Sequence, residues 1–226
     1  MASHNGYGDA LCARLKPEVS CLNLARNGRS SKTFREEGRW SEVQQLLQHG
    51  ENYRATYVLI QFGHNDQPGK PGRSTDLVTE FPVNMERYAN ETRALGGIPV
   101  LVTPLTRRSF KGAWLQNDLA PWAAATRQAA ARAHAAVLDL NADSYAAVQP
   151  MGQDGADTLA MVPRPASYGS GATDLNKAEP AGVTKTAFDR THLGAKGADL
   201  FARIVETEMV HALPETRASF RDGGKP

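Results

Sequence analysis

The chain has 226 residues, of which 41% are hydrophobic and 22% are charged, an ordinary composition for a folded globular domain. Its formal net charge of +2 is too small to indicate a nucleic-acid partner. The longest apolar runs, 57–62 and 98–102, are far shorter than the roughly 20 residues that cross a membrane. We therefore expect one domain over residues 1–226, with no membrane partner.

Short apolar runs alternate with segments of helical spacing along the chain. The helical spacing predicts helices at 7–15, 40–48, 82–95, 121–134 and about 195–212. The apolar runs predict buried strands at 20–24, 57–62, 98–103 and 136–140. Strands separated by helices are typical of a parallel sheet with helices on both faces. The predicted fold class is α/β, a three-layer doubly wound sandwich.

The start of the chain departs from the usual doubly wound order. Such sheets open with a strand, whereas the first element predicted here is a helix. We therefore expect the first, central strand of the sheet to be missing from this sequence. Two stretches, 70–80 and 151–186, lack a regular pattern and are predicted to be loops near a site.

Cys12 and Cys21 are the two cysteines of the chain. They could form a bridge in an oxidising compartment or remain as two buried thiols, and the sequence leaves both readings open. Without clustered histidines they do not indicate a zinc site, so no metal is expected. Residues 1–8 lack the basic and apolar regions of a signal peptide, and the compartment stays unknown.

The clearest chemical signal lies near the C-terminus. Asp189 and His192 are three positions apart and precede a helical run rich in glycine and alanine. At this spacing the carboxylate can accept the Nδ1 proton of the imidazole, which leaves Nε2 to act as a general base. The pair is half of a hydrolytic triad.

Polar segments follow three of the predicted strands, at the edge where open α/β sheets collect their active sites. They are residues 23–31, 61–66 and 103–108. Acyl transfer needs hydrogen-bond donors aimed at the oxygen where negative charge develops. Gly28 can expose its backbone N–H and Asn65 can offer a side-chain amide, so both are candidate oxyanion donors.

Three arginines lie on these loops: Arg29, Arg107 and Arg108. A guanidinium binds a carboxylate through two parallel hydrogen bonds, so these residues are candidates for binding the carboxylate groups of a substrate. The alternative for each is an ordinary solvated surface charge.

Three motifs occur in a characteristic order: Asn-x-Ala-x-x-Gly-Arg-Ser-Ser from Asn23, Gly-His-Asn-Asp from Gly63, and Asp-x-x-His from Asp189. They resemble blocks II, III and V of the SGNH hydrolases, the GDSL esterase superfamily. The fuller text, with 101–104 and the Arg107-Arg108 pair, resembles the rhamnogalacturonan acetylesterase branch. The resemblance covers nearly the whole chain and implies a single SGNH hydrolase-like domain with the flavodoxin-like sandwich of that family.

By this resemblance, His192 is the general base, Asp189 orients it, and Gly28 and Asn65 bind the oxyanion. The implied reaction removes acetyl groups from a pectic polysaccharide such as rhamnogalacturonan through an acyl-serine intermediate, with no cofactor. The implied partner is an acetylated polysaccharide or oligosaccharide. Secretion or a periplasmic location follows only from the family analogy, and the oligomeric state is not indicated.

The family's nucleophile belongs to a Gly-Asp-Ser motif, which this chain does not contain. Residues 1–8 resemble the family text just downstream of that motif, so we expect an N-terminally truncated and inactive chain. Ser3 is the nearest hydroxyl, but no strand precedes it to hold a nucleophile turn. The alternatives are a non-catalytic carbohydrate-binding pseudo-esterase and a nucleotide-binding flavodoxin-like domain.

Overall fold

The computed structural model describes residues 6–166 and 188–221 of the chain. Its centre is a parallel sheet with the strand order β1-β2-β5, formed by β1 (Tyr57–Ile60), β2 (Ile98–Val102) and β5 (Ala136–Leu138). The helix α4 (Phe81–Ala94) connects β1 to β2, and α5 (Ala120–Arg132) precedes β5. Parallel neighbours need such crossover connections, because a tight turn cannot join them.

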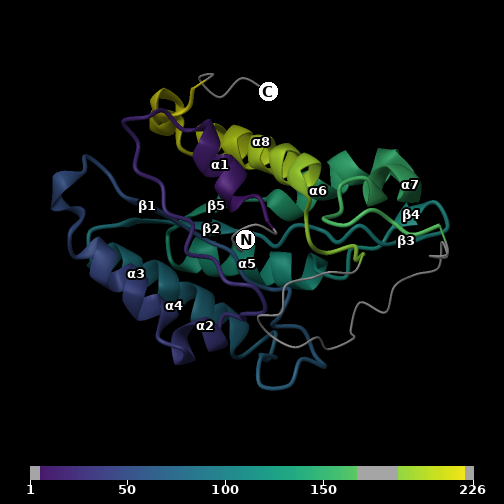
Figure 1. The fold of residues 1–226 in the computed structure, drawn as a ribbon. Coiled ribbons are helices and arrows are strands. Elements are labelled where there is room, and N and C mark those ends of the chain that lie inside the picture. Colours follow the sequence, from purple (N-terminus) through teal and green to yellow (C-terminus); the bar gives the residue numbers. More distant parts are fainter. Residues whose placement is uncertain (1–5, 167–187, 222–226) are drawn as a thin grey trace.

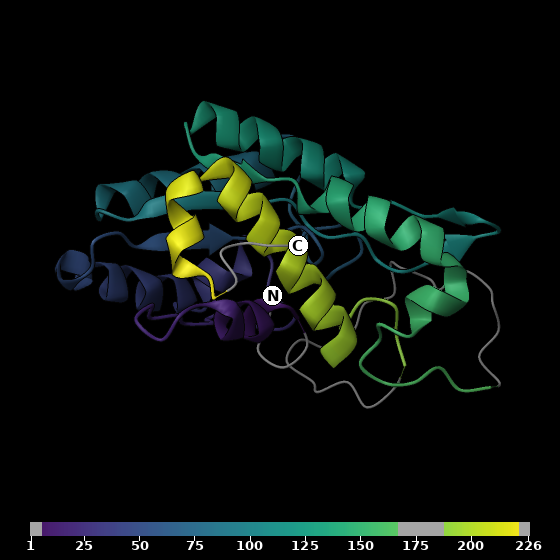
Figure 2. The same ribbon diagram turned by 90° about the horizontal axis from the view of Figure 1, so that it is seen from above.

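Helices cover both faces of this sheet (Figures 1 and 2). On one face lie α2 (Thr33–Glu36), α3 (Arg39–Leu47), α4 and α5, and on the other α1 (Gly8–Arg14), α6 (Leu140–Val148) and α8 (Ala195–Ala212). Alternation along β2 divides the core between the two layers. Val100 and Val102 belong to the apolar cluster of Phe201 in α8, whereas Leu101 belongs to that of Trp122 in α5. The predicted α/β fold, a parallel sheet between helical layers, is confirmed.

The predicted long helices end within two residues of their observed bounds. The sequence pattern did not predict α6, which has nine residues. It also missed several shorter elements: α2, α7 (Gly152–Asp157), the hairpin of β3 (Phe110–Lys111) and β4 (Trp114–Leu115), and the 3-10 turns Gly50–Asn52, Gln149–Met151 and Pro214–Ser219. Within the described ranges no helix combines the length and apolarity needed to cross a membrane.

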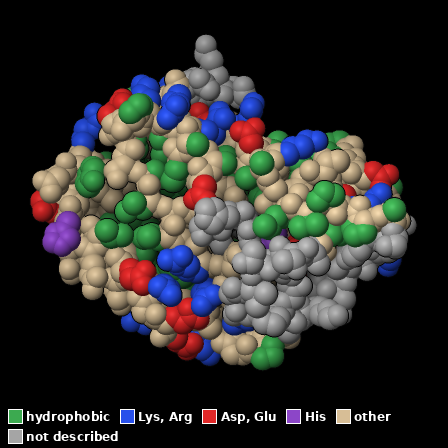
Figure 3. All heavy atoms as spheres, in the orientation of Figure 1, with side chains coloured by type: hydrophobic (Ala, Val, Ile, Leu, Met, Phe, Trp, Pro, Cys, Tyr) green, Lys and Arg blue, Asp and Glu red, His purple; other side chains and the backbone are tan. Residues whose placement is uncertain are grey.

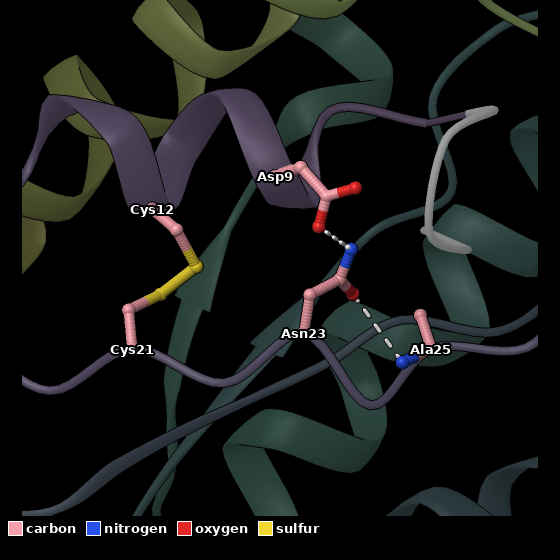
Figure 4. The surroundings of a disulfide bond; sticks show 5 residues. All are labelled: Asp9, Cys12, Cys21, Asn23 and Ala25. Atoms are coloured by element: carbon pink, nitrogen blue, oxygen red, sulfur yellow. Dashed lines mark hydrogen bonds between the residues drawn. A yellow bond between two sulfur atoms is a disulfide. The ribbon is translucent and has the colours of Figure 1, made fainter.

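The strand predicted at 20–24 does not form. Its residues have no regular secondary structure and pair with no strand of the described sheet, and Leu22 is 62% exposed. The segment is tied to α1 instead, by a Cys12–Cys21 disulfide and by a hydrogen bond of 2.7 Å from Asn23 Nδ2 to Asp9 (Figure 4). The bridge decides between the two readings of the cysteines. It also fixes the chain that leads into the Gly28 loop.

The prediction that the first, central strand is missing concerns the edge of the sheet beside β1. Among the described residues β1 pairs with β2 alone, so its other edge has no strand partner there. The absence of a first, central strand stays a prediction.

The two predicted loops differ in their outcome. Residues 70–80 form an irregular chain of turns, as expected. The stretch 151–186 begins with α7, whereas its part from 167 to 186 lies outside the described residues.

A group of carboxylates lies where α8 packs against α6. Glu208 of α8 has both carboxylate oxygens buried without a hydrogen-bond donor among the described residues. Burial raises the pKa of Glu208 to about 9, and the neighbouring carboxyl groups of Asp143 and Asp139 add to this rise. The Tyr7 hydroxyl lies in the same region, since burial and the Glu208 charge raise the pKa of Tyr7. Ionisation of Glu208 is therefore unfavourable in the folded state.

Glu208→Gln is expected to raise the thermal unfolding midpoint at pH 8 by about 2–4 °C and to leave it nearly unchanged at pH 4.5. The folded-state pKa of about 9 lies above the ordinary 4.5, so stability falls as the pH rises between these two values. Glutamine cannot ionise and removes this loss. Calorimetry at both pH values checks it, with Glu51→Gln on an exposed turn as the control. Equal midpoints of variant and wild type at pH 8 would contradict the prediction.

Candidate active site

Asp189 and His192 form a hydrogen-bonded pair in the loop just before α8. His192 Nδ1 lies 2.9 Å from Asp189 Oδ2, and Asp189 Oδ1 accepts the backbone N–H groups of Thr191 and His192, each at 2.7 Å. These local bonds explain the spacing, because a carboxylate can close such a turn only over two to three residues. Among the described residues no group bonds to His192 Nε2.

The carboxylate of this pair is held in its charged form. Burial alone raises the pKa of Asp189, but the hydrogen bonds and charge of His192 and the N–H of Thr191 outweigh it and lower the pKa to about 2. The ionised carboxylate accepts the Nδ1 proton and so fixes the tautomer that leaves Nε2 as an acceptor. The arrangement can take up a proton from an attacking hydroxyl.

Arg108 supports the loop of residues 189–192, here called the dyad loop, through hydrogen bonds to its backbone. Its side chain is fully buried, and its guanidinium donates to the backbone carbonyls of His192 at 2.7 Å and of Asp189 and Thr191 at 3.3 Å. Its backbone N–H also donates to the carbonyl of Arg190 at 2.9 Å. Arg108 was predicted to bind substrate, and that contact stays a prediction. In this structure its guanidinium is enclosed and supports the loop of Asp189 and His192 through bonds to backbone carbonyls, so it is not a solvated surface charge.

Arg107 points to a different set of partners. It is 4% exposed and forms a close ion pair with Asp118, and its Nη2 donates to the carbonyl of His64 at 3.4 Å. Burial lowers the pKa of Arg107, whereas the charges of Asp118 and Asp189 raise it. Arg107 is therefore not a solvated surface charge either, and a substrate contact by Arg107 stays a prediction.

Arg29 is the arginine of the three that stays partly accessible. Its side chain is 21% exposed, its Nε donates to Glu37 at 2.7 Å, and its Nη1 donates to the carbonyl of Asn27 at 2.7 Å. A substrate contact by Arg29 remains a prediction.

The structure brings the Gly28 loop and Asn65 together. Asn65 Nδ2 donates to the carbonyl of Arg29, the residue after Gly28, at 3.2 Å. Gly28 has a φ of +76°, a left-handed conformation that glycine adopts without strain. Its N–H donates to no described residue. Because an amide group has two hydrogens, Asn65 keeps one for a further acceptor.

The sequence interpretation missed Arg73. Its Nη1 donates to Asn65 Oδ1 at 3.3 Å, from a loop in which the Arg73 and Ser74 N–H groups bond to the Lys70 carbonyl at 2.9 Å. This bond fixes which way the Asn65 amide faces, so Nδ2 is directed toward the Gly28 loop. The sequence signal was the basic residue in the polar loop after the Gly-His-Asn-Asp motif.

Asp66 joins the two donor loops. Its fully buried carboxylate accepts hydrogen bonds from the Ser31 N–H at 3.0 Å, the Ser31 hydroxyl at 2.6 Å, the Gly63 N–H at 2.9 Å and the Thr75 hydroxyl at 3.1 Å. Burial raises the pKa of Asp66 to about 6, although these donors oppose the rise. One carboxylate thus links the loop that contains Gly28 to the loop that contains Asn65.

His64 lies within electrostatic range of His192. Desolvation lowers the pKa of His64 well below its ordinary value, and the charges of Arg107 and His192 contribute. Its ring is therefore close enough to His192 for an electrostatic effect, and it is neutral at pH 7. The described residues contain no group of three or more His, Cys, Asp or Glu side chains arranged to hold a metal ion.

Comparison with known proteins places these motifs in context. The chain is 28% identical over 204 residues to the probable rhamnogalacturonan acetylesterase YesY of Bacillus subtilis, which covers 90% of this chain and 82% of that protein. It is 29% identical over 201 residues to the rhamnogalacturonan acetylesterase RhgT of the same organism, over 88% of this chain and 78% of that protein.

Solved structures share the fold. The crystal structure of the YXIM protein of Bacillus subtilis superposes with a TM-score of 0.68 at 20% identity, over 93% of this chain. The chain spans about half of that protein, 51% of its length. In addition, the profile of the GDSL-like lipase/acylhydrolase family matches residues 2–200. The chain therefore belongs to the GDSL-like lipase/acylhydrolase family, the SGNH hydrolases.

Proposed function

We propose that this single domain is built to remove acetyl groups from a pectic polysaccharide such as rhamnogalacturonan. The observation that carries the proposal is the His192–Asp189 pair, whose Nε2 is unbonded among the described residues. Support comes from the candidate donors Gly28 and Asn65, whose loops are joined by the bond from Asn65 Nδ2 to the Arg29 carbonyl. The names of the curated relatives support the choice of substrate.

The proposed reaction begins when Nε2 of His192 takes the proton of a serine hydroxyl as its oxygen attacks the acetyl carbonyl. The tetrahedral oxyanion accepts hydrogen bonds from Gly28 and Asn65. As the intermediate collapses, the imidazolium gives its proton to the departing sugar oxygen and an acetyl-serine remains. Water, activated by the same nitrogen, then releases acetate. Asp189 stays ionised throughout because its pKa is about 2.

We propose that none of the described serines is the nucleophile. The Ser30 and Ser31 side chains are fully buried, and Ser31 bonds to Asp66. Ser3, Ser167 and Ser170 lie outside the described residues. We therefore propose that the 226-residue chain by itself is inactive or nearly so.

The expected result is hydrolysis of p-nitrophenyl acetate by the 226-residue chain at the buffer rate, with no change in Ser3→Ala. A chain extended at its N-terminus by a strand that ends in Gly-Asp-Ser is expected to release acetate from acetylated rhamnogalacturonan. Removal of one oxyanion donor, in Asn65→Ala of that form, is expected to lower kcat about 100- to 1000-fold. Matched circular dichroism of all forms is the folding control.

Two results would count against the proposal. Robust turnover by the 226-residue chain that survives Ser3→Ala would contradict the proposal that this chain lacks the nucleophilic serine. An extended, folded chain that binds the polysaccharide but releases no acetate would favour the non-catalytic pseudo-esterase.

A further inference from the structure

The β3–β4 hairpin presents one face to the core and the other to solvent. Phe110 pairs with Leu115, and both are buried, at 2% and 4% exposure. Lys111 pairs with Trp114, and these two are exposed, Trp114 to 68%. Side chains alternate between the faces of a hairpin, so Lys111 and Trp114 stand side by side on the outer face. The apolar packing of the hairpin does not require the indole.

Both outward side chains are free of partners within the described ranges. The Trp114 indole N–H donates to none of these residues, and no described carboxylate pairs with the Lys111 ammonium. A large apolar ring exposed beside an unpaired cation is a surface that can stack on a ring and attract an anion.

The hairpin is held firmly although it is short. The Gln149 side chain accepts from the Leu115 N–H at 2.8 Å and donates to the Ala113 carbonyl at 2.9 Å. The Gln153 side chain accepts from the Phe110 N–H at 3.1 Å and donates to the Arg108 carbonyl at 2.9 Å. Both strands are therefore fixed at their outer edges, and little conformational entropy would be lost when a ligand binds.

The hairpin continues directly from the candidate active site. Ser109 and Gln116 close its base through a backbone bond of 2.8 Å, and the neighbouring Arg108 holds the dyad loop. Trp114 follows Ser109 by only five residues, across the turn at Gly112, so the hairpin reaches roughly 10 Å outward. In Figures 1 and 2 it lies beside α7 at one end of the molecule.

We propose that Trp114 and Lys111 form a carbohydrate subsite that binds an acidic sugar residue of the polymer. The indole packs against the apolar C–H face of the sugar ring, its N–H donates to a hydroxyl, and the ammonium pairs with the uronate carboxylate. The polymer class rests on the proposed function. A nucleic acid could also stack on an indole, but the net charge is only +2, and Lys/Arg and Asp/Glu lie interspersed on the face in Figure 3.

Tryptophan fluorescence tests this directly, because Trp40 and Trp122 are 4% and 3% exposed and acrylamide therefore reports mainly on Trp114. A galacturonate oligosaccharide is expected to shift the emission of the wild type to the blue and to protect it from acrylamide. Calorimetry is expected to give about tenfold weaker binding for Trp114→Ala. Trp114→Phe keeps a smaller ring, so its affinity for the oligosaccharide should lie between those of the wild type and Trp114→Ala.

Lys111→Ala tests the charge. We expect about threefold weaker binding of the galacturonate oligosaccharide, as for an exposed ion pair, and unchanged binding of the same oligosaccharide with its carboxyl groups reduced to alcohols. Tyr53→Ala, at a residue 54% exposed elsewhere, is the matched control and should bind like the wild type.

Three outcomes would overturn the inference: equal binding by Trp114→Ala and wild type, no binding of the oligosaccharide by wild type, or Trp114-dependent binding of single-stranded DNA alone. None of these measurements uses acetate release. Trp114-dependent binding without esterase activity in any form would leave the subsite standing and remove the proposed reaction. Acetate release without Trp114-dependent binding would do the reverse.

Discussion

Asp66→Ala is expected to lower the free energy of unfolding by about 3–5 kcal/mol, the range for the loss of one partner from a buried charged network. The carboxylate is fully buried and accepts four hydrogen bonds, from the Ser31 N–H and hydroxyl, the Gly63 N–H and the Thr75 hydroxyl. Alanine leaves these donors without an acceptor, and each unsatisfied donor costs more than an ordinary hydrogen bond contributes. Urea unfolding at pH 7 measures the change.

Two further variants separate the causes. Asp66→Asn keeps the side-chain volume and one acceptor oxygen, so it should lose less free energy of unfolding than Asp66→Ala. It should still be less stable than wild type, because its NH2 group faces a donor. The folded-state pKa of about 6 lies above the ordinary 3.8, so wild-type stability falls as the pH rises between them, and Asp66→Asn should lack this slope. Asp154→Ala, at an exposed ion pair, should change stability by less than about 1 kcal/mol.

The same substitution should loosen both donor loops. Ser31 is three residues after Gly28, and Gly63 is two residues before Asn65. Hydrogen exchange of 27–31 and 63–67 should therefore speed up in Asp66→Ala more than exchange in β2. Unfolding within about 1 kcal/mol of wild type, with unchanged exchange in these loops, would show that the carboxylate does not join them.

The sequence predicted those parts of the fold that depend on local periodicity. The runs at 57–62, 98–103 and 136–140 became strands because apolar residues on both faces suit a covered sheet. The run at 20–24 contains Ser20 and Asn23 and no β-branched or aromatic residue, and it forms no strand. Strand pairing is decided by a neighbour distant in sequence, and here a disulfide and Asn23 attach the segment to α1.

The candidate site divides in the same way. The Asp189–His192 hydrogen bond is local and could be predicted from a spacing of three residues. The roles of Arg107 and Arg108 could not, because adjacent residues in an irregular segment face different partners, Asp118 in one case and the dyad loop in the other. Arg73 was missed because its contact with Asn65 depends on how the turn at 70–74 folds.

The second large effect is expected for Arg108→Met, which should lower the free energy of unfolding by about 2–4 kcal/mol. The guanidinium donates to the carbonyls of Asp189, Thr191 and His192, and a thioether cannot replace these bonds. Methionine does remove one cost, because Arg108 Nε is buried without a partner among the described residues. Burial lowers the pKa of Arg108 to about 10, so the group stays charged at pH 7 and the loss should be constant between pH 6 and 8.

Control variants distinguish hydrogen bonding of Arg108 to the dyad loop from nonspecific packing of its side chain. Arg108→Lys keeps the charge but not the planar fork, so it should recover only part of the stability. Arg127→Met, at an exposed pair with Asp139, should cost less than about 1 kcal/mol. In Arg108→Met the His192 Nδ1 proton should exchange faster in NMR spectra, because the carbonyls that hold the loop have lost their donor. If Arg108→Met unfolded like wild type and kept slow exchange at His192, the dyad loop would have to be held by its own turn and by α8 alone.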